Sequence, residues 1–210
     1  MTLAYWDVDT QRDFMNKNGR LSVPNAHLIR PNLKRLTQNA LENDILILGS
    51  SDDHFDDDKE LDTFHPHCMH GSKGQLRIPE TKTPETVIHN KLYPLQKPVK
   101  YLNNEIITEI KFGAPRITFL KQTTDVFKNK NVDKFLKILK MDEFVVYGVA
   151  TEYCVKHAVL GLLERGYKVY LVTDAIKGIN NVEVIKAMSE MMEAGVIPID
   201  TYEATSGWFL

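Results

Sequence analysis

A cysteine in the string GVATEYC is the first residue in this sequence that could do chemistry. The string runs from Gly148 to Cys154 and joins an apolar segment, Phe144–Val149, to a helix-length amphipathic segment. Thr151 is a suitable N-cap residue, which would place Cys154 in the first helical turn. The free N–H groups and the helix dipole there favour an anion, so the pKa of the thiol can fall. The alternative is a buried cysteine that packs as a small apolar side chain.

Two charged residues at the ends of other apolar segments favour the catalytic interpretation of Cys154. Asp9 directly follows Leu3–Val8, and Lys121 directly follows Ile117–Leu120. If these segments are parallel strands, their carboxyl ends meet at one edge of the sheet, and the three side chains lie together. A base that accepts the thiol proton, beside a cation that stabilises anions, makes an activated nucleophile. Either charge taken alone is compatible with an ordinary loop residue.

A second group of residues has the types and spacing of a metal site. Asp52 and His54 follow the apolar segment Ile45–Gly49, and because they are two apart their side chains face the same way in extended chain. His67 comes thirteen residues after His54. Carboxylate and imidazole ligands suit zinc, iron or manganese. Glu60 or a neighbouring aspartate is a candidate for the fourth ligand.

The same segment also allows plainer interpretations. Seven carboxylates lie within the eleven positions from Asp52 to Asp62. A charge run of this kind is usually a solvated face, and we expect most of these residues to be solvated. Cys68 is a possible thiolate ligand, but it directly follows His67 and would face away from it in an extended segment. We therefore expect a structural role for Cys68.

The remaining pattern indicates how the candidate residues are positioned. Short apolar runs alternate with segments that carry apolar residues at three- and four-residue steps. The expected strands are Leu3–Val8, Ile45–Gly49, Ile117–Leu120, Phe144–Val149, Val169–Thr173 and Val196–Ile199. The expected helices are Ala26–Glu42, Lys130–Lys140, Glu152–Arg165 and Asn181–Ala194. This alternation predicts right-handed βαβ units in a three-layer, Rossmann-like α/β/α fold with a mostly parallel central sheet.

Length and composition limit the class of protein. The 210 residues are 43% hydrophobic and carry a formal net charge of −2. We expect a single domain over residues 1–210, with a loop insertion at about 50–100 that holds five of the seven histidines. The charge balance offers no basic face for nucleic acid. No apolar run approaches the roughly 18–20 residues of a membrane helix.

The ends of the chain and its cysteines bear on location. The N-terminal residues show neither the basic start nor the apolar stretch of a signal peptide. Two cysteines cannot make a disulfide framework. A cytoplasmic, reduced chain is therefore expected.

Four motifs in this order resemble the isochorismatase-like cysteine hydrolases, and within them the nicotinamidase and pyrazinamidase group. They are DTQRDF (Asp9–Phe14), DDH (Asp52–His54) with FHPHCMHG (Phe64–Gly71), Lys121 after a strand, and GVATEYCV (Gly148–Val155). The resemblance covers the chain from Asp9 to about Ile199. The last motif is the most specific, and the D-x-H and P-H-C pair separates nicotinamidases from metal-free relatives.

The resemblance implies roles for the residues around the cysteine. Asp9, Lys121 and Cys154 match the catalytic triad of the family. The bond between Val149 and Ala150 matches a cis peptide, and the amides of Ala150 and Cys154 match the oxyanion hole.

The resemblance also implies the metal ligands. Asp52, His54 and His67 match them, and Glu60 stands where some relatives carry another histidine. The chain has His65 in the place of the first proline of the usual P-P-H-C string.

The substrate pocket is implied in the same way. Phe14 and Phe64 match walls around a pyridine ring, although many relatives carry tryptophan at the second position. The segment Gln122–Phe127 lacks the tyrosine and small residues that often follow the lysine.

The function that the resemblance implies is hydrolysis of nicotinamide to nicotinate and ammonia, with pyrazinamide-type amides as further substrates, through a thioester on Cys154. It implies one divalent transition metal, zinc in first place and iron or manganese as alternatives, and no organic cofactor. The expected partner is a small amide, with no nucleic acid and no membrane, and a homo-oligomer is left open. The alternatives are a related cysteine amidase that acts on another small amide or carbamoyl compound, and a non-catalytic member of the fold.

Overall fold

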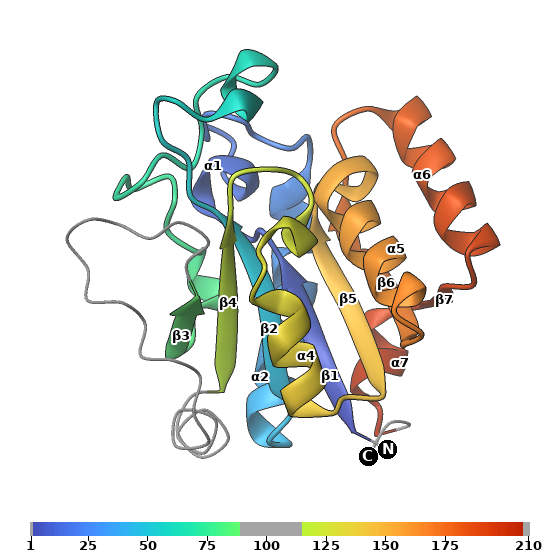
Figure 1. The fold of residues 1–210 in the computed structure, drawn as a ribbon. Helices are drawn as coiled ribbons and strands as arrows, with labels where there is room; N and C mark the ends of the chain where they lie inside the picture. Colours follow the sequence, from blue (N-terminus) through green and yellow to red (C-terminus); the bar gives the residue numbers. More distant parts are fainter. Residues whose placement is uncertain (1, 89–114, 208–210) are drawn as a thin grey trace.

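Seven parallel strands form the centre of the computed structural model, which describes residues 2–88 and 115–207 (Figure 1). They are β1 (Leu3–Val8), β2 (Leu46–Asp52), β3 (Glu85–Ile88), β4 (Arg116–Lys121), β5 (Glu143–Val149), β6 (Lys168–Lys177) and β7 (Ile197–Ile199). The order across the sheet is β3-β4-β2-β1-β5-β6-β7, and every neighbouring pair is parallel. This confirms the predicted α/β fold class.

Helices cover both faces of the sheet. Those with α-helical geometry are α1 (Arg12–Met15), α2 (Arg30–Glu42), α4 (Val132–Leu139), α5 (Lys156–Glu164), α6 (Asn181–Glu193) and α7 (Thr201–Thr205). Short 3-10 turns are η1 (Ala26–Ile29), η2 (Lys59–Asp62), η3 (Pro79–Thr81) and η4 (Val126–Lys128), and η5 (Thr151–Val155) is a π-helical turn. Helices α4, α5 and α6 lie on one face, and α2 and α7 lie on the other (Figure 1).

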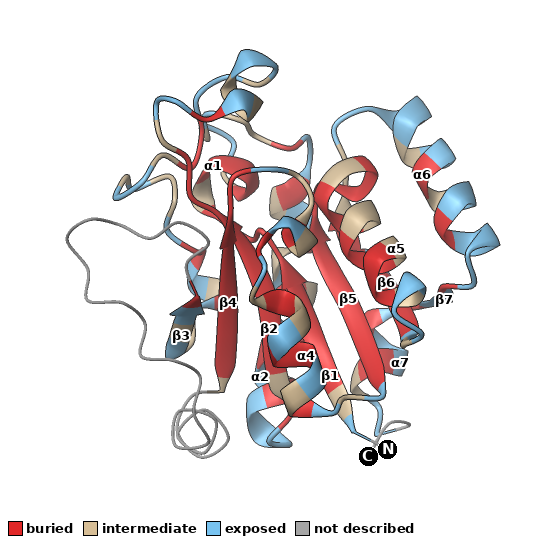
Figure 2. Cartoon of the chain, viewed as in Figure 1, coloured by how far each residue is buried: buried red, intermediate tan, exposed pale blue. Residues whose placement is uncertain are grey.

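The core is divided by the sheet into two layers, because successive side chains of a strand point to opposite faces. In β1, Trp6 packs in the layer under α4 and α5, and Tyr5 packs in the layer under α2. Both β4 and β5 are buried along their whole length (Figure 2). Strands covered on both faces need the nearly continuous apolar runs that the sequence shows.

The predicted elements differ from the observed ones mainly at their ends. The expected helix Ala26–Glu42 is the 3-10 turn η1 followed by α2, whose first turn contains a proline. Strand β3 was not predicted, because it is a half-exposed edge strand without an apolar run. In the expected insertion at 50–100, the described part holds η2, η3 and β3, and residues 89–100 lie outside the described residues. Among the described helices, none is both long and apolar enough to cross a membrane.

A buried ion network surrounds Asp7, which is the second-last residue of β1. The Asp7 carboxylate is fully buried and accepts hydrogen bonds from Arg116 at 2.7 Å and from Arg77 at 3.0 Å. Arg77 also donates to Ser51 at 3.0 Å, and Arg116 donates to the carbonyl oxygen of Thr81 at 2.9 Å. The network therefore joins β1, β2 and β4 to the loop that precedes β3.

We expect Asp7→Asn to lower the free energy of unfolding by about 3–5 kcal/mol, because two buried guanidinium groups lose their shared counter-charge. Urea unfolding followed by circular dichroism measures this. The control is Asp133→Asn, which removes a largely exposed pair with Arg165 at 2.6 Å and should lower it by less than about 1 kcal/mol. Equal effects of the two substitutions would show that burial of the Asp7 network adds nothing to the free energy of unfolding.

Candidate active site and metal centre

Lys121, the last residue of β4, lies at the centre of the candidate site. Its ammonium group is buried and contacts Asp9 Oδ2 at 2.8 Å, a carboxylate oxygen of Asp52, and the Sγ atom of Cys154 at 3.3 Å. Burial alone would lower the pKa of Lys121. The carboxylates of Asp52 and Asp9 outweigh it, so the pKa is raised well above that of an ordinary lysine and the group stays charged.

These residues meet because four parallel strands end at the same edge of the sheet. The register pairs Asp52 with Lys121, and it pairs Val8 with both Ser50 and Gly148. Asp9 then leaves the end of β1 in the left-handed region, with φ of 47°. Aspartate and asparagine tolerate this conformation better than most residues.

Asp9 is suited to exchange a proton with the thiol. Its carboxyl group is fully buried, contacts Lys121 at 2.8 Å, and lies close enough to the Cys154 side chain for each group to affect the pKa of the other. Burial raises the pKa of Asp9, Lys121 opposes the shift, and the nearby Asp52 adds to it. The net direction is upward, as for a carboxyl group that can hold a proton during a reaction.

Cys154 lies in the π-helical turn η5, and two expectations about it are wrong. Thr151 is not the N-cap, because the cap position is Ala150 and no side chain caps the turn. The expected fall in the thiol pKa is outweighed by burial, which raises the pKa of Cys154 well above its ordinary value. Lys121 lowers this pKa and Asp9 raises it. The resting thiol therefore keeps its proton and needs a base beside it to react.

The four expected metal-ligand candidates lie together. Asp52, His54, Glu60 and His67 each offer one ligand atom, and these atoms all lie within 4.8 Å of one another. His67 Nε2 is 3.5 Å from Asp52 Oδ2, and His54 Nε2 is 3.7 Å from the same oxygen. Within the described part of the chain, Asp52 Oδ2 and His54 Nε2 are buried without a hydrogen-bond partner. Buried polar atoms are rarely left so, and a divalent cation fits this donor set.

Both histidines are held in one tautomer by their second ring nitrogen. His67 Nδ1 donates to the carbonyl oxygen of His65 at 2.7 Å, since a carbonyl can only accept. His54 Nδ1 is 3.3 Å from Asp58 Oδ2, and the same oxygen accepts from the N–H of Phe55 at 2.9 Å. In the neutral form of each ring, Nε2 then presents its lone pair to the ligand group. Outer contacts of this kind orient metal-binding histidines.

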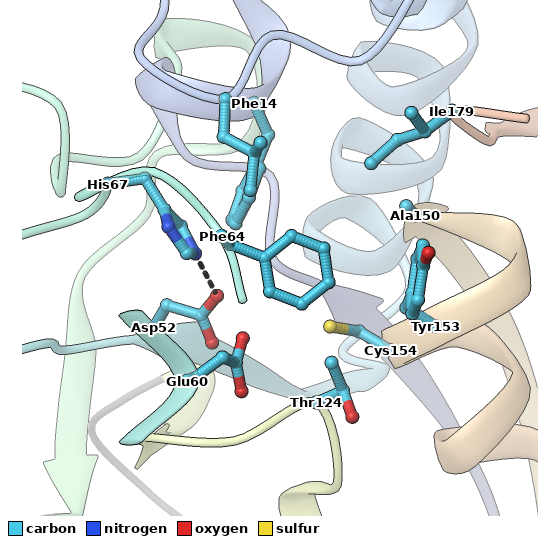
Figure 3. A pocket seen from close by; sticks show the side chains of 11 residues that line it. Phe14, Asp52, Glu60, Phe64, His67, Thr124, Ala150, Tyr153, Cys154 and Ile179 are labelled. Atoms are coloured by element: carbon cyan, nitrogen blue, oxygen red, sulfur yellow. Dashed lines mark ion pairs between the residues drawn. The ribbon is translucent and has the colours of Figure 1, made fainter. Parts of the chain in front are cut away.

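A pocket with an empty volume of about 300 Å³ separates the ligand group from the thiol. Figure 3 shows His67, Asp52 and Glu60 on one side and Cys154 on the other, with Phe14 and Phe64 between them. Apolar and polar side chains that were not singled out in the sequence complete the lining: Leu21, Thr124, Tyr153 and Ile179. Thr124 lies in the segment Gln122–Phe127 that was expected at the pocket.

Two further sequence expectations concern backbone and cysteine. The peptide bond between Val149 and Ala150 is cis. Cys68 lies outside the metal-ligand group, is fully buried, and donates its backbone N–H to Asp13 Oδ2 at 2.8 Å. Asp58 was not distinguished from its acidic neighbours, because its position under His54 is visible only in the fold.

We expect Asp58→Ala to weaken zinc binding by about 10- to 100-fold, because His54 loses the contact that fixes its ring. Competition with a chromophoric chelator measures the affinity, and elemental analysis gives the stoichiometry. Asp56→Ala, at an exposed position of the same acidic run, is the control and should bind zinc as the parent does. Unchanged affinity in Asp58→Ala, or no transition metal bound by the parent, would contradict this assignment.

Comparison with known proteins gives consistent matches. A family model described as the isochorismatase domain matches residues 102–203. The nicotinamidase of Escherichia coli is 27% identical over 95% of this chain and 96% of that protein. The fold is shared with the pyrazinamidase of Pyrococcus horikoshii solved in complex with zinc (TM-score 0.74, 24% identity, 95% of this chain and 99% of that chain). It is also shared with the N-carbamoylsarcosine amidase of Thermoplasma acidophilum (TM-score 0.73, 20% identity, 96% and 97%).

Proposed function

We propose that the chain is an isochorismatase-like hydrolase and, within that family, a nicotinamidase, which converts nicotinamide to nicotinate and ammonia. The observation that carries the proposal is the position of Lys121, which contacts the thiol of Cys154, the carboxylate of Asp9 and the metal-ligand candidate Asp52. The nucleophile and part of the ligand group thus line one pocket, and the base lies buried beside it against Lys121. The overall similarity to a nicotinamidase supports the same activity.

The proposed substrate fits the two ends of the pocket. Asp52, His54, Glu60 and His67 would hold one divalent ion, zinc in first place with iron or manganese as alternatives. When bound, that ion would supply a Lewis acid for the pyridine ring nitrogen.

The rest of the lining suits the ring and its amide. Phe14 and Phe64 would lie against the ring faces. The carboxamide would then point toward Cys154, and no organic cofactor is needed.

The chemistry follows from the residues around the thiol. Asp9 accepts the thiol proton, and the sulfur of Cys154 attacks the carbonyl carbon. The backbone amides of Ala150 and Cys154 would bind the developing oxyanion. As the carbon–nitrogen bond breaks, Asp9 returns the proton to the leaving ammonia and a thioester remains. Water then adds to the thioester, Asp9 relays its proton to the sulfur, and nicotinate leaves.

Lys121 keeps this sequence of steps electrostatically balanced. Its ammonium group offsets the negative charge as it moves from Asp9 to the sulfur, because it contacts both groups. A fixed cation at this place stabilises the thiolate without taking part in the proton transfer.

A related cysteine amidase that acts on a carbamoyl compound is the second candidate, and the fold shared with a carbamoylsarcosine amidase favours it. The cluster of metal-ligand candidates favours nicotinamide, since it offers a partner to the ring nitrogen. The cytoplasmic location and the oligomeric state stay predictions.

Ammonia release from nicotinamide, pyrazinamide and a carbamoyl amide tests the proposal. We expect turnover of the first two. Cys154→Ala should lose activity by about 10⁴-fold or more while the protein stays folded, because the covalent nucleophile is gone. Cys68→Ala is the matched control and should stay within a few-fold of the parent. Turnover of the carbamoyl amide alone, or equal losses in the two cysteine variants, would overturn the assignment.

The effect of Asp9 on the thiol can be measured through its pH dependence. Burial raises the pKa of Cys154, and the Asp9 carboxylate raises it further, so in Asp9→Asn the thiol should titrate at lower pH, with burial and Asp52 still opposing Lys121. Asparagine also suits the left-handed backbone at this position. Turnover should nevertheless fall by about 10²- to 10⁴-fold, because no base remains.

The rate of alkylation by iodoacetamide against pH measures the thiol titration in both proteins. The midpoint for Asp9→Asn should lie below that of the parent. A midpoint that is unmoved or shifted upward would show that Asp9 does not act on Cys154.

A further inference from the structure

Glu152 is a buried carboxylate that the proposed chemistry does not use. It lies in η5, two residues before Cys154, and is only 6% exposed. Its Oε1 atom accepts hydrogen bonds from the backbone N–H groups of Ile179 and Asn180, each at 2.7 Å. These residues belong to the loop that joins β6 to α6. The turn that carries the nucleophile is thereby tied to a loop that is far away in the sequence.

The tied loop forms one wall of the pocket. Ile179 lines it together with Tyr153 and Cys154, and in Figure 3 the Ile179 side chain extends into the pocket from the loop before α6. The other end of the loop is fixed by Asn180, whose side chain caps α6 by accepting from the N–H of Val182 at 2.9 Å.

The loop backbone approaches Glu152 closely at Gly178. A Cβ atom on Gly178 would lie 2.3 Å from Glu152 Oε2 and 2.2 Å from a methyl group of Val184, so only glycine allows this approach. Within the described residues, Oε2 has no hydrogen-bond partner. Among these residues, the carboxylate is therefore hydrogen-bonded to the loop backbone through Oε1.

We propose that Glu152 is a positioning residue that holds Ile179 as a wall of the pocket, and so limits the width of the ring that can reach Cys154. The substrate class is then a single six-membered aromatic ring that bears a carboxamide, and a fused second ring is excluded on the Ile179 side. The carboxamide in this substrate class rests on the proposed function, whereas the role of Glu152 in holding Ile179 as a pocket wall does not.

The test compares two alkylating reagents in a Cys68→Ala background, where Cys154 is the only thiol. Iodoacetamide is small, whereas N-phenylmaleimide carries a phenyl ring and needs a wider pocket to reach the thiol. The ratio of their rates reports on pocket width, because the reactivity of the thiolate cancels. In Glu152→Ala and in Ile179→Ala the ratio should shift toward the wide reagent by about five- to tenfold.

Coupling between the two residues separates positioning from general damage. If Glu152 acts through Ile179, the double variant should show no larger shift than either single variant. Glu152→Gln should behave as the parent, because the amide oxygen still accepts both N–H groups. Glu190→Ala is the matched control, since it removes the exposed ion pair with Lys156 at 3.0 Å that also links α6 to α5.

Additive shifts, an unchanged ratio, or a Glu152→Gln variant as altered as Glu152→Ala would overturn the proposal. So would an equal fall in both rates, which would mean that Glu152 positions Cys154 and not the wall. If Glu152→Ala does not fold, Gly178→Ala replaces it, because the added methyl group displaces the same loop.

Enzyme assays add a second readout. Glu152→Ala should raise KM for nicotinamide more than it lowers kcat, and it should admit quinoline-3-carboxamide as a substrate. If the parent hydrolyses no amide, the proposed function fails while the alkylation ratios still decide the role of Glu152.

Discussion

A buried ammonium group organises this site. Lys121 is stable inside the protein only because the carboxylates of Asp9 and Asp52 lie against it, since an unpaired buried charge is very unfavourable. Asp52 uses one oxygen for Lys121 and offers the other to the metal-ligand group. The nucleophile and the metal-ligand group are therefore one electrostatic unit. A change of charge on either side alters the field at the other through Lys121.

The parallel sheet makes this arrangement possible. The ends of β1, β2, β4 and β5 are fixed by register, and the buried pairs of Asp7 with Arg77 and Arg116 fix the strands just below. The charged side chains at the ends of these apolar strands are shielded from water and lie close to one another. The rigidity of the strands holds the distances among Asp9, Lys121 and Cys154 that proton transfer requires.

The site residues that can be predicted from the sequence are those whose chemical type differs from that of their neighbours in the chain. Asp9 and Lys121 are charges directly after apolar runs, and His54 and His67 are histidines in an irregular segment, so each stands out. Glu152 does not, because its partners at Ile179 and Asn180 come near it only when β6 packs beside β5. The direction of the thiol pKa was also missed, since burial of Cys154 depends on the whole fold and outweighs the local turn.

In the proposed mechanism, the fold separates the groups that react from the groups that select the substrate. Asp9 and Lys121 sit on or directly after rigid strands, whereas Ile179 and Thr124 come from loops that follow strands. A substitution in a loop can change the width of the pocket without moving the strand ends. Glu152 is the exception, because it lies on the turn of Cys154 and reaches into a loop. In our proposal, Glu152 therefore couples the position of the pocket wall to the position of the Cys154 turn. The distance between the bound ring and the reacting thiol is then set by one side chain.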